Sequence, residues 1–470
     1  MGKLLKTYLM PHPPIMINEI GGGEEERIRA TIAAAMTAAE EIGEAKPDTL
    51  IIIVPPHGPA FSDAMSINTD KELSGDLGHF GAPQIKFEYQ VDSELVNIIM
   101  QKSTQNNIPI ASIDKASSKR YKISEKLDHG SMVPLYFINK KYKDFKIVHI
   151  TYGLLCNEEL YHFGRIIREA VEESSSSSII VASGDLSHRL TYDAPAGFDP
   201  LGQKFDETLV NLLEKSSVDE IMEMDREFIE AAGECGYRSI LVLMGSLDGV
   251  EVLPEILSYE GPFGVGYCVA SYNIKMDNPS LKRVESLYKK RGDRIMKLRE
   301  QEDQYIKLAR MSLENYVKTG ETIKIPKDLP DEMLNSKAGA FVSLKKSGEL
   351  RGCIGTINGV QSNIAGEIIE NAISAGTGDP RFYPVQEDEL SEIIYSVDVL
   401  GKAESIISIE ELDPLKYGVI VRKGMKSGLL LPNLEGVNTA SEQVGIALRK
   451  AGIEKSEDYK MERFEVIRHK

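Results

Sequence analysis

The sequence predicts an N-terminal α/β domain with a mostly parallel sheet covered by helices, followed by a smaller α+β domain. Three observations lead to this expectation. Up to about residue 275, short β-branched apolar runs alternate with amphipathic segments, which is typical of parallel strands covered on both faces. After about residue 300 the pattern changes to paired strands with fewer helices. A basic stretch separates the two parts of this 470-residue chain.

The first domain is expected to alternate strands with helices in chain order. Its strand runs are short and rich in Ile and Val, whereas its helical segments are longer and amphipathic. The expected strands are Lys3–Met10, Leu50–Val54, Lys146–Thr151 and Ile179–Ser183. The expected helices are Glu24–Ile42, Ser93–Gln105, Asn157–Glu173, Gln203–Glu214, Val218–Glu230 and Gly236–Leu247. Five serines, Ser174–Ser178, predict a short flexible connection.

The boundary between the domains is predicted from charge. Residues 275–310 hold 11 Lys and Arg against 6 Asp and Glu, in a chain whose net charge is −17. Most of Leu281–Tyr316 is helix-forming. We therefore expect a first domain at 1–275, a solvated basic linker helix at 276–299 and a second domain at 300–470. A small basic docking face is the alternative interpretation of the linker.

The second domain is expected to contain two hairpin-like strand pairs, one further strand and two helices. The strands are Phe341–Leu344 with Leu350–Ile354 around a Ser347-Gly348 turn, Ile393–Leu400, and Val419–Arg422 with Leu429–Leu431. The helices are Gln361–Ala375 and Ala440–Ala451, the latter ending at Gly452.

Composition excludes several classes of protein. With 42% hydrophobic and 27% charged residues the chain is typical of a soluble globular protein. The acidic balance argues against a general nucleic-acid binder, because such affinity comes from Lys and Arg at phosphates. Apolar runs such as 50–54 are far shorter than the ~20 residues that span a bilayer. The four cysteines are sparse and lack metal or redox spacing. We therefore expect a cytoplasmic protein with reduced thiols.

Three histidines follow strands directly. His12 comes after the first strand, His57 after the second, and His188 after the strand that ends at Ser183. In open α/β sheets, ligands bind at the carboxyl ends of strands. Prolines on one or both sides of His12 and His57 restrict their backbone. The pattern predicts that the three side chains meet in one crevice, although each could instead be a hydrogen-bonded loop histidine.

Two imidazoles plus one carboxylate suit non-haem ferrous iron, and also catalytic zinc. Glu234 is a candidate carboxylate, since it lies at the entry to an apolar helix where a solubilising glutamate is not needed. Its neighbour Cys235 could supply a thiolate instead, and Glu234 could simply meet the helix dipole. His129, between Asp128 and Gly130, could donate a hydrogen bond to a substrate oxygen; a capping turn made by Asp128 is the alternative.

Together these motifs resemble the class III extradiol ring-cleavage dioxygenases, the LigB-like family, and its relative the Memo family. The resembling motifs, within about residues 1–275, are Pro11–Pro14, Pro56–Gly58, Leu127–Leu135, Gly184–His188 and Gly233-Glu234. The resemblance implies ferrous iron held by His12, His57 and Glu234, with His188 as general acid/base and His129 as an orienting, proton-donating residue. The Memo branch has a cysteine in place of the ligand carboxylate, so Cys235 stays open as the third ligand.

The second part of the chain is similar to the AMMECR family, whose chemistry is not settled. The motifs are Leu350–Gly355, Asp379–Phe382 and Gly428–Pro432. The two families occur together with a radical-SAM protein in the AmmeMemoRadiSam system, and this chain looks like a fusion of the first two members. Arg351 and Arg381 are candidates for anion recognition beside Cys353, and internal salt bridges are the alternative. We interpret Cys353 as structural, because the only histidine in this part is His469.

The resulting hypothesis is an Fe(II)-dependent oxygenase that cleaves or oxidises a catechol-like aromatic with dioxygen. The alternative is a catalytically silent metal-binding partner that acts with a radical-SAM enzyme in modification of a macromolecule. A zinc hydrolase is the weaker third interpretation. We expect no membrane partner, and association of the chain with further copies of itself.

Overall fold

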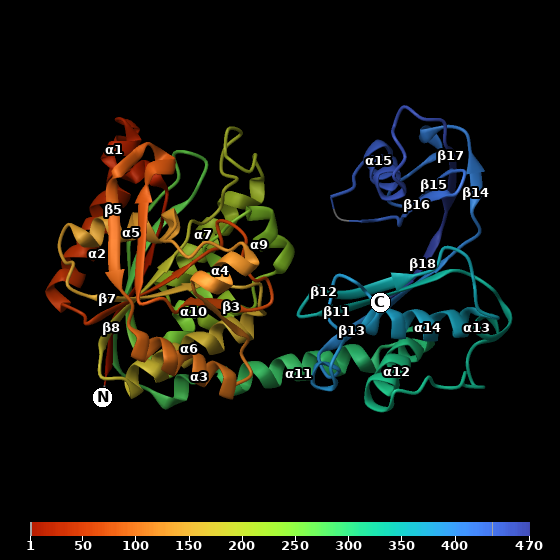
Figure 1. Cartoon of the computed structure of the whole chain (residues 1–470), viewed down its shortest axis with the longest axis horizontal. Coiled ribbons are helices and arrows are strands. Elements are labelled where there is room, and N and C mark those ends of the chain that lie inside the picture. The colour runs from red at the N-terminus through yellow and green to blue at the C-terminus, as the bar shows by residue number, and fades with distance from the viewer. Residues whose placement is uncertain (1, 435) are drawn as a thin grey trace. The chain divides into compact units, whose positions relative to one another are not determined.

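The computed structural model describes residues 2–434 and 436–470. The chain divides into two compact units between Tyr288 and Lys289. The division lies inside helix α11 (Val284–Glu300). In Figure 1 the first unit is coloured from red to green and the second from green to blue. The first unit is α/β and the second is a smaller unit of antiparallel sheets and helices, which confirms the predicted fold classes. Within the described ranges, no helix combines the length and apolar character needed to cross a bilayer.

The first unit is built on an eight-stranded sheet in the order β6-β3-β7-β2-β8-β1-β10-β9. Its strands are β1 Lys3–Met10, β2 Thr49–Val54, β3 Met65–Asn68, β6 Ile110–Ile113, β7 Lys146–Thr151, β8 Ser177–Ser183, β9 Val250–Glu260 and β10 Tyr267–Asp277. The central strands β7, β2, β8 and β1 run parallel. Every residue of β2 is buried, as expected where helices cover both faces of a sheet. Antiparallel pairing begins at β10 and at β3.

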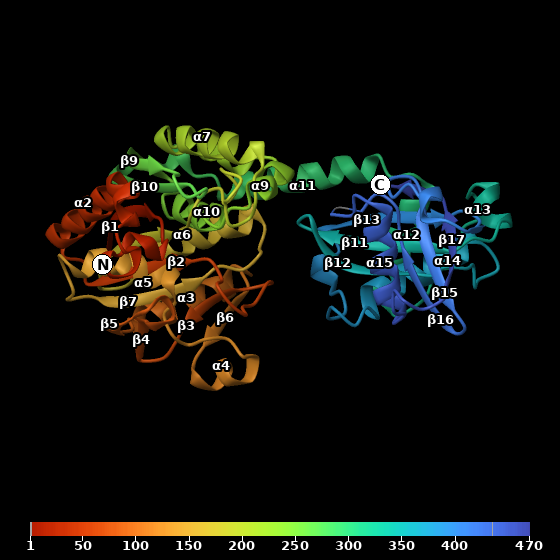
Figure 2. The same cartoon turned by 90° about the horizontal axis from the view of Figure 1, so that it is seen from above.

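Helices flank this sheet (Figure 2). They are α1 Asn18–Gly21, α2 Arg29–Ala45, α3 Ser93–Gln105, α4 Lys115–Tyr121, α5 His129–Asn139, α6 Asn157–Glu173, α7 Pro200–Glu214, α8 Val218–Met222, α9 Arg226–Ala232 and α10 Tyr237–Ser246. A separate hairpin pairs β4 (Glu72–Leu77) with β5 (Ala82–Gln90). The helix expected at 218–230 is two helices, because the Asp225 side chain accepts the N–H of Phe228 and starts α9 afresh.

Helices α6 and α10 pack closely because a glycine, Gly245, lies where they contact each other. A Cβ on Gly245 would lie 1.8 Å from the carbonyl oxygen of Tyr161. We expect Gly245→Ala to destabilise the first unit by about 1–3 kcal/mol through overpacking, measured as a lower midpoint of thermal unfolding. Gly292→Ala is the matched control: it is also helical and a Cβ there meets nothing within 4 Å. An unchanged midpoint for Gly245→Ala would contradict the close packing.

The second unit contains two four-stranded antiparallel sheets, in the orders β12-β11-β13-β18 and β14-β17-β15-β16. Its elements are α12 Gln304–Thr319, α13 Asp331–Asn335, β11 Ala340–Lys346, β12 Glu349–Gly355, α14 Ile364–Thr377, β13 Ile393–Leu400, β14 Glu404–Ile406, β15 Gly418–Lys423, β16 Lys426–Leu430, α15 Ala440–Ala451, β17 Lys460–Phe464 and β18 Val466–His469. The hairpin expected around Ser347 and Gly348 is present, and both residues have positive φ, 56° and 84°, as a tight hairpin turn requires.

Candidate metal centre

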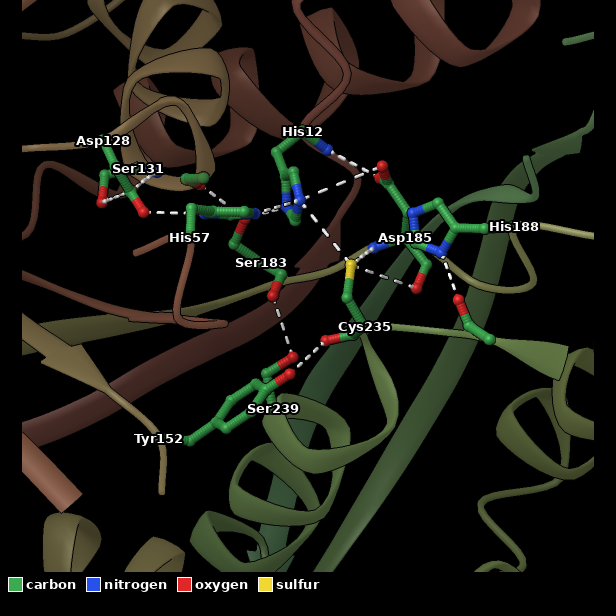
Figure 3. Close-up of polar contacts among 12 residues, drawn as sticks. His12, His57, Asp128, Ser131, Tyr152, Ser183, Asp185, His188, Cys235 and Ser239 are labelled. Carbon is green, nitrogen blue, oxygen red and sulfur yellow. Dashed lines mark hydrogen bonds and ion pairs between the residues drawn. The ribbon is translucent and has the colours of Figure 1, made fainter. Parts of the chain in front are cut away.

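Three histidines meet at the carboxyl ends of the central strands (Figure 3 shows two of them). His12 follows β1, His57 follows β2, and His129 begins α5. The Nε2 atoms of His12 and His57 lie 3.2 Å apart, and the ring centroids of His57 and His129 lie 3.9 Å apart. One nitrogen from each of the three rings lies within 4.8 Å of the other two.

Hydrogen bonds fix which nitrogen of His12 carries the proton. The hydroxyl of Ser183 donates its single proton to the carbonyl of Gly130 at 2.5 Å. It must therefore accept from Nδ1 of His12, at 2.9 Å, which leaves the lone pair on Nε2. Burial first, and then the neighbouring His57, lowers the pKa of His12 to about 3, so the ring is neutral near pH 7.

His57 is oriented in the same way by Asp128. Its Nδ1 lies 2.7 Å from Oδ2 of Asp128. Burial alone would raise the pKa of Asp128, but the hydrogen bond with His57 and the nearby histidines hold it well below the usual range. The ionised carboxylate can only accept, so Nδ1 of His57 donates, and in the neutral ring Nε2 carries the lone pair. Gly130 permits this approach, since a Cβ there would lie 2.7 Å from the His57 ring.

With both rings neutral, two acceptor nitrogens face each other 3.2 Å apart, and neither can donate to the other. A cation between them removes the repulsion. Imidazole nitrogens bind Zn²⁺ at about 2.0–2.1 Å, which places two tetrahedral ligand atoms about 3.3–3.4 Å apart. The observed separation is close to this value, so His12 and His57 fit a divalent transition metal.

Cys235 and Asp185 join His12 in a second group of potential ligands. The Cys235 sulfur lies 3.7 Å from Nε2 of His12 and accepts the backbone N–H of Asp185 at 3.3 Å. Tyr152 donates to the Cys235 carbonyl at 2.8 Å and anchors its backbone (Figure 3). Burial raises the pKa of the Cys235 thiol; a bound cation acts in the opposite direction and favours the thiolate.

The Asp185 carboxylate is held by the backbone of His12. Its Oδ1 accepts the His12 N–H at 2.9 Å, and its Oδ2 lies 3.9 Å from His12 Nε2. Burial raises the pKa of Asp185 to about 6. Asp185 lies within the Gly184–His188 motif but was not among the predicted site residues. Its position directly after β8 was the signal that could have identified it.

Glu234, the carboxylate preferred from the sequence as third ligand, does not join the cluster in this structure. Its carboxylate accepts the N–H of Tyr237 at 2.5 Å, at the beginning of α10. Among the described residues, the groups that could hold a metal include Cys235 but not Glu234. Gly233 ends α9 in the left-handed conformation, with φ 62°, and the chain after this turn directs Cys235 toward His12. The helix-terminus alternative therefore describes Glu234.

His188 lies beside Asp185 on a braced loop. Its Nδ1 lies 2.6 Å from the Gly233 carbonyl, which can only accept. In the neutral ring the lone pair is then on Nε2. The preceding Ser187 donates its N–H to Asp206 at 2.8 Å and its hydroxyl to the Ala232 carbonyl at 2.9 Å. These contacts fix the loop that carries His188 and its Nε2 atom.

His129 lies over His57 with its ring partly buried. Its pKa is lowered to about 4, first by burial and then by His57 and His12, so the ring is neutral near pH 7. The Asp128 side chain accepts the Ser131 N–H and caps α5. Asp128 therefore makes the capping turn, and the His129 side chain lies in the histidine cluster, so both features occur together.

In the second unit, the two candidate arginines contact carboxylates of the same unit. Arg351 makes paired hydrogen bonds of 2.9 and 2.8 Å to Glu389, and Arg381 makes paired bonds of 2.9 and 2.6 Å to Asp379. The backbone N–H of Cys353 also donates to Asp379, at 2.9 Å. In this structure carboxylates of the same unit pair with both guanidinium groups, as the salt-bridge alternative describes.

Comparisons with known proteins agree with the two-unit division. Residues 6–270 match the family model of the catalytic LigB subunit of aromatic ring-opening dioxygenase, and residues 306–469 match that of AMMECR1. A protein of Clostridium acetobutylicum is 50% identical over 465 residues, which cover 98% of each chain. A protein of Thermotoga maritima is 51% identical over 171 residues, 36% of this chain and 98% of that protein. The crystal structure of an uncharacterised protein from Pyrococcus horikoshii is 33% identical and covers 36% of this chain and 90% of that chain, with a TM-score of 0.34.

Proposed function

The chain belongs to the family of the catalytic LigB subunit of aromatic ring-opening dioxygenases, with an AMMECR1 domain after it, and from this premise we propose that its first unit is an iron(II)-dependent oxygenase of catechol-like aromatics. The metal would be held by His12 and His57, with Cys235, from the second group that shares His12, as the third ligand. The observation that carries the proposal is the pair of Nε2 lone pairs 3.2 Å apart, each set by a hydrogen bond on the far side of its ring.

The third ligand is the point at which this proposal departs from a two-histidine, one-carboxylate site. Cys235 lies 3.7 Å from His12 Nε2, and bonds of about 2.0–2.1 Å to nitrogen and about 2.3 Å to sulfur place such ligands about 3.6 Å apart. The N–H of Asp185 that points at the sulfur stabilises a thiolate. Thiolate with imidazole also suits zinc, and metal analysis of the purified protein distinguishes the two metals.

Bound iron would supply the electronic route by which an aromatic ring and dioxygen can react. The protein supplies proton transfer around it. His188 offers Nε2 as the acceptor of a phenolic proton, because its Nδ1–H is committed to Gly233. His129, neutral and beside His57, orients a substrate hydroxyl. General acid–base catalysis of this kind contributes about 10²–10⁴-fold to a rate.

The test is metal analysis of anaerobically purified full-length protein, together with dioxygen uptake on 3,4-dihydroxyphenyl compounds. We expect iron in the wild type and less than about a tenth of it in a His12→Ala, His57→Ala double variant, as loss of two ligands predicts. His188→Gln should keep the iron and lose about 10²–10⁴-fold in uptake. His162→Gln is the control, since His162 on α6 contacts Tyr288 at 3.2 Å, outside the cluster.

Full iron retention by the double variant would contradict the site. Iron without uptake on any diphenol, together with copurification of a radical-SAM partner, would instead support a catalytically silent metal-binding protein. Zinc in place of iron in the anaerobic preparation would contradict the oxygenase and leave the ligand set intact.

A further inference from the structure

His129 belongs to the histidine cluster but is not among the metal ligands proposed above. One nitrogen of its ring lies within 4.8 Å of a nitrogen of His12 and a nitrogen of His57, and these two also lie within that distance of each other. Cys235 meets the same condition in the group that it forms with His12 and Asp185. His129 is therefore within ligand reach of the position that the other two histidines define.

The rings of His57 and His129 are closer than ring packing alone requires. Their centroids are 3.9 Å apart and their planes are inclined by 42°, whereas the centroids of ordinary aromatic pairs are about 4.5–7 Å apart. The His12 ring is inclined by 83° to His57 and by 78° to His129. Because the lone pair of an imidazole nitrogen lies in the plane of its ring, three inclined rings can direct one nitrogen each at a common point. A shared cation accounts for this close approach.

One ion can bind all three nitrogens after small side-chain movements. Two imidazole ligands with bonds of about 2.0–2.1 Å lie about 3.3–4.2 Å apart, from tetrahedral to opposite positions. The Nε2 atoms of His12 and His57 are already 3.2 Å apart. Nε2 of His12 has its lone pair available, because Ser183 donates to the Gly130 carbonyl and accepts from Nδ1 of His12. Three imidazoles are also a known ligand set of catalytic zinc.

The backbone and one aromatic neighbour hold His129 at the cluster. His129 is the first residue of α5, and the side chain of the N-cap residue Asp128 fixes the first turn of that helix. Phe80, beside the tip of the β4–β5 hairpin, contacts the His129 ring with centroids 5.3 Å apart and planes inclined by 62°. A Cβ on Gly75 of the same hairpin would lie 2.9 Å from the Leu127 carbonyl oxygen. The hairpin thus packs closely against the segment that presents His129.

We propose that His129 is a direct metal ligand in the substrate-free protein, so that three histidine nitrogens bind the ion. Cys235 then takes the fourth position, which closes a tetrahedral site. A substrate can reach the ion only after His129 has left it, and the released ring then faces the substrate hydroxyl. The inference rests on the proposed function for the position of the metal, and it deepens that function by giving His129 a role before substrate binds.

The experiment loads the full-length, metal-free protein with an equimolar amount of Zn²⁺ alone and counts the imidazole ligands by X-ray absorption spectroscopy. We expect three imidazoles in the wild type and two in His129→Ala. Chelator competition should show a loss of about 100-fold or more in Zn²⁺ affinity for His129→Ala, above the 10–100-fold typical of residues that only orient a ligand. His79→Ala is the matched control, since His79 is exposed and precedes Phe80 at the tip of the same hairpin.

Two imidazoles in the wild type, or wild-type Zn²⁺ affinity in His129→Ala, would overturn His129 as a ligand. The count on the wild type needs no variant, so it decides the matter even where His129→Ala fails to fold. Failure of the proposed function is distinguishable. A protein without iron or dioxygen uptake that binds Zn²⁺ through three imidazoles would contradict the oxygenase and support the ligand. Iron and uptake together with two imidazoles would do the reverse.

Discussion

Replacing Cys235 with serine is expected to remove the metal from the protein, whereas replacing Glu234 with glutamine is expected to leave it bound. The Cys235 sulfur lies 3.7 Å from the His12 nitrogen that carries the lone pair, and a neutral serine hydroxyl is a poor substitute for a thiolate. Glu234 accepts the Tyr237 N–H instead, and the carbonyl of glutamine can accept the same bond. The two variants therefore show which of these two neighbouring residues binds the metal.

The measurement is competition with a chelator of known affinity, followed by metal analysis after dialysis. We expect Cys235→Ser to lose about 100-fold or more in metal affinity, above the 10–100-fold typical of residues that only orient a ligand. Glu234→Gln should stay within about twofold of the wild type, within the error of such measurements. The opposite order would restore Glu234 as the third ligand and show that the segment after Gly233 rearranges when metal binds.

The general plan of the site could be predicted because it depends on topology. Strand ends of a parallel sheet share one edge, so His12 and His57 could be placed together from the runs that precede them. Of the central strands, β2 is almost entirely apolar, and the apolar residues of β1, β7 and β8 were enough to identify the strands. The short strand β3 and the terminal strands β17 and β18 were not expected, because four or five residues with mixed polarity carry little periodic signal.

The choice between Glu234 and Cys235 could not be predicted in the same way. It depends on one turn at Gly233, where a left-handed residue decides which of the next two side chains faces the histidines. Sequence alone shows that a glycine permits this turn but not which way the chain leaves it.

The second large effect is expected at Asp128, which is not itself one of the proposed metal ligands. Its carboxylate holds the Nδ1–H tautomer of His57 at 2.7 Å. In Asp128→Asn, the amide oxygen would keep the capping bond from the Ser131 N–H, since asparagine is a good N-cap. The amide N–H₂ would then face His57 as a donor. His57 would have to accept at Nδ1 and carry its proton on Nε2, where the lone pair is needed.

We therefore expect Asp128→Asn to fold normally and to lose about 10–100-fold in metal affinity, as found for partners that orient histidine ligands. Chelator competition measures the affinity, and the ¹⁵N shifts of His57 in the metal-free protein report the tautomer directly. Asp114→Asn is the matched control, because Asp114 caps α4 in the same way and its side chain accepts from Ala116 and Ser117 rather than from a histidine. Wild-type affinity in Asp128→Asn would show that metal binding alone selects the tautomer. An altered tautomer with weaker binding would establish that Asp128 prepares His57 before the metal arrives.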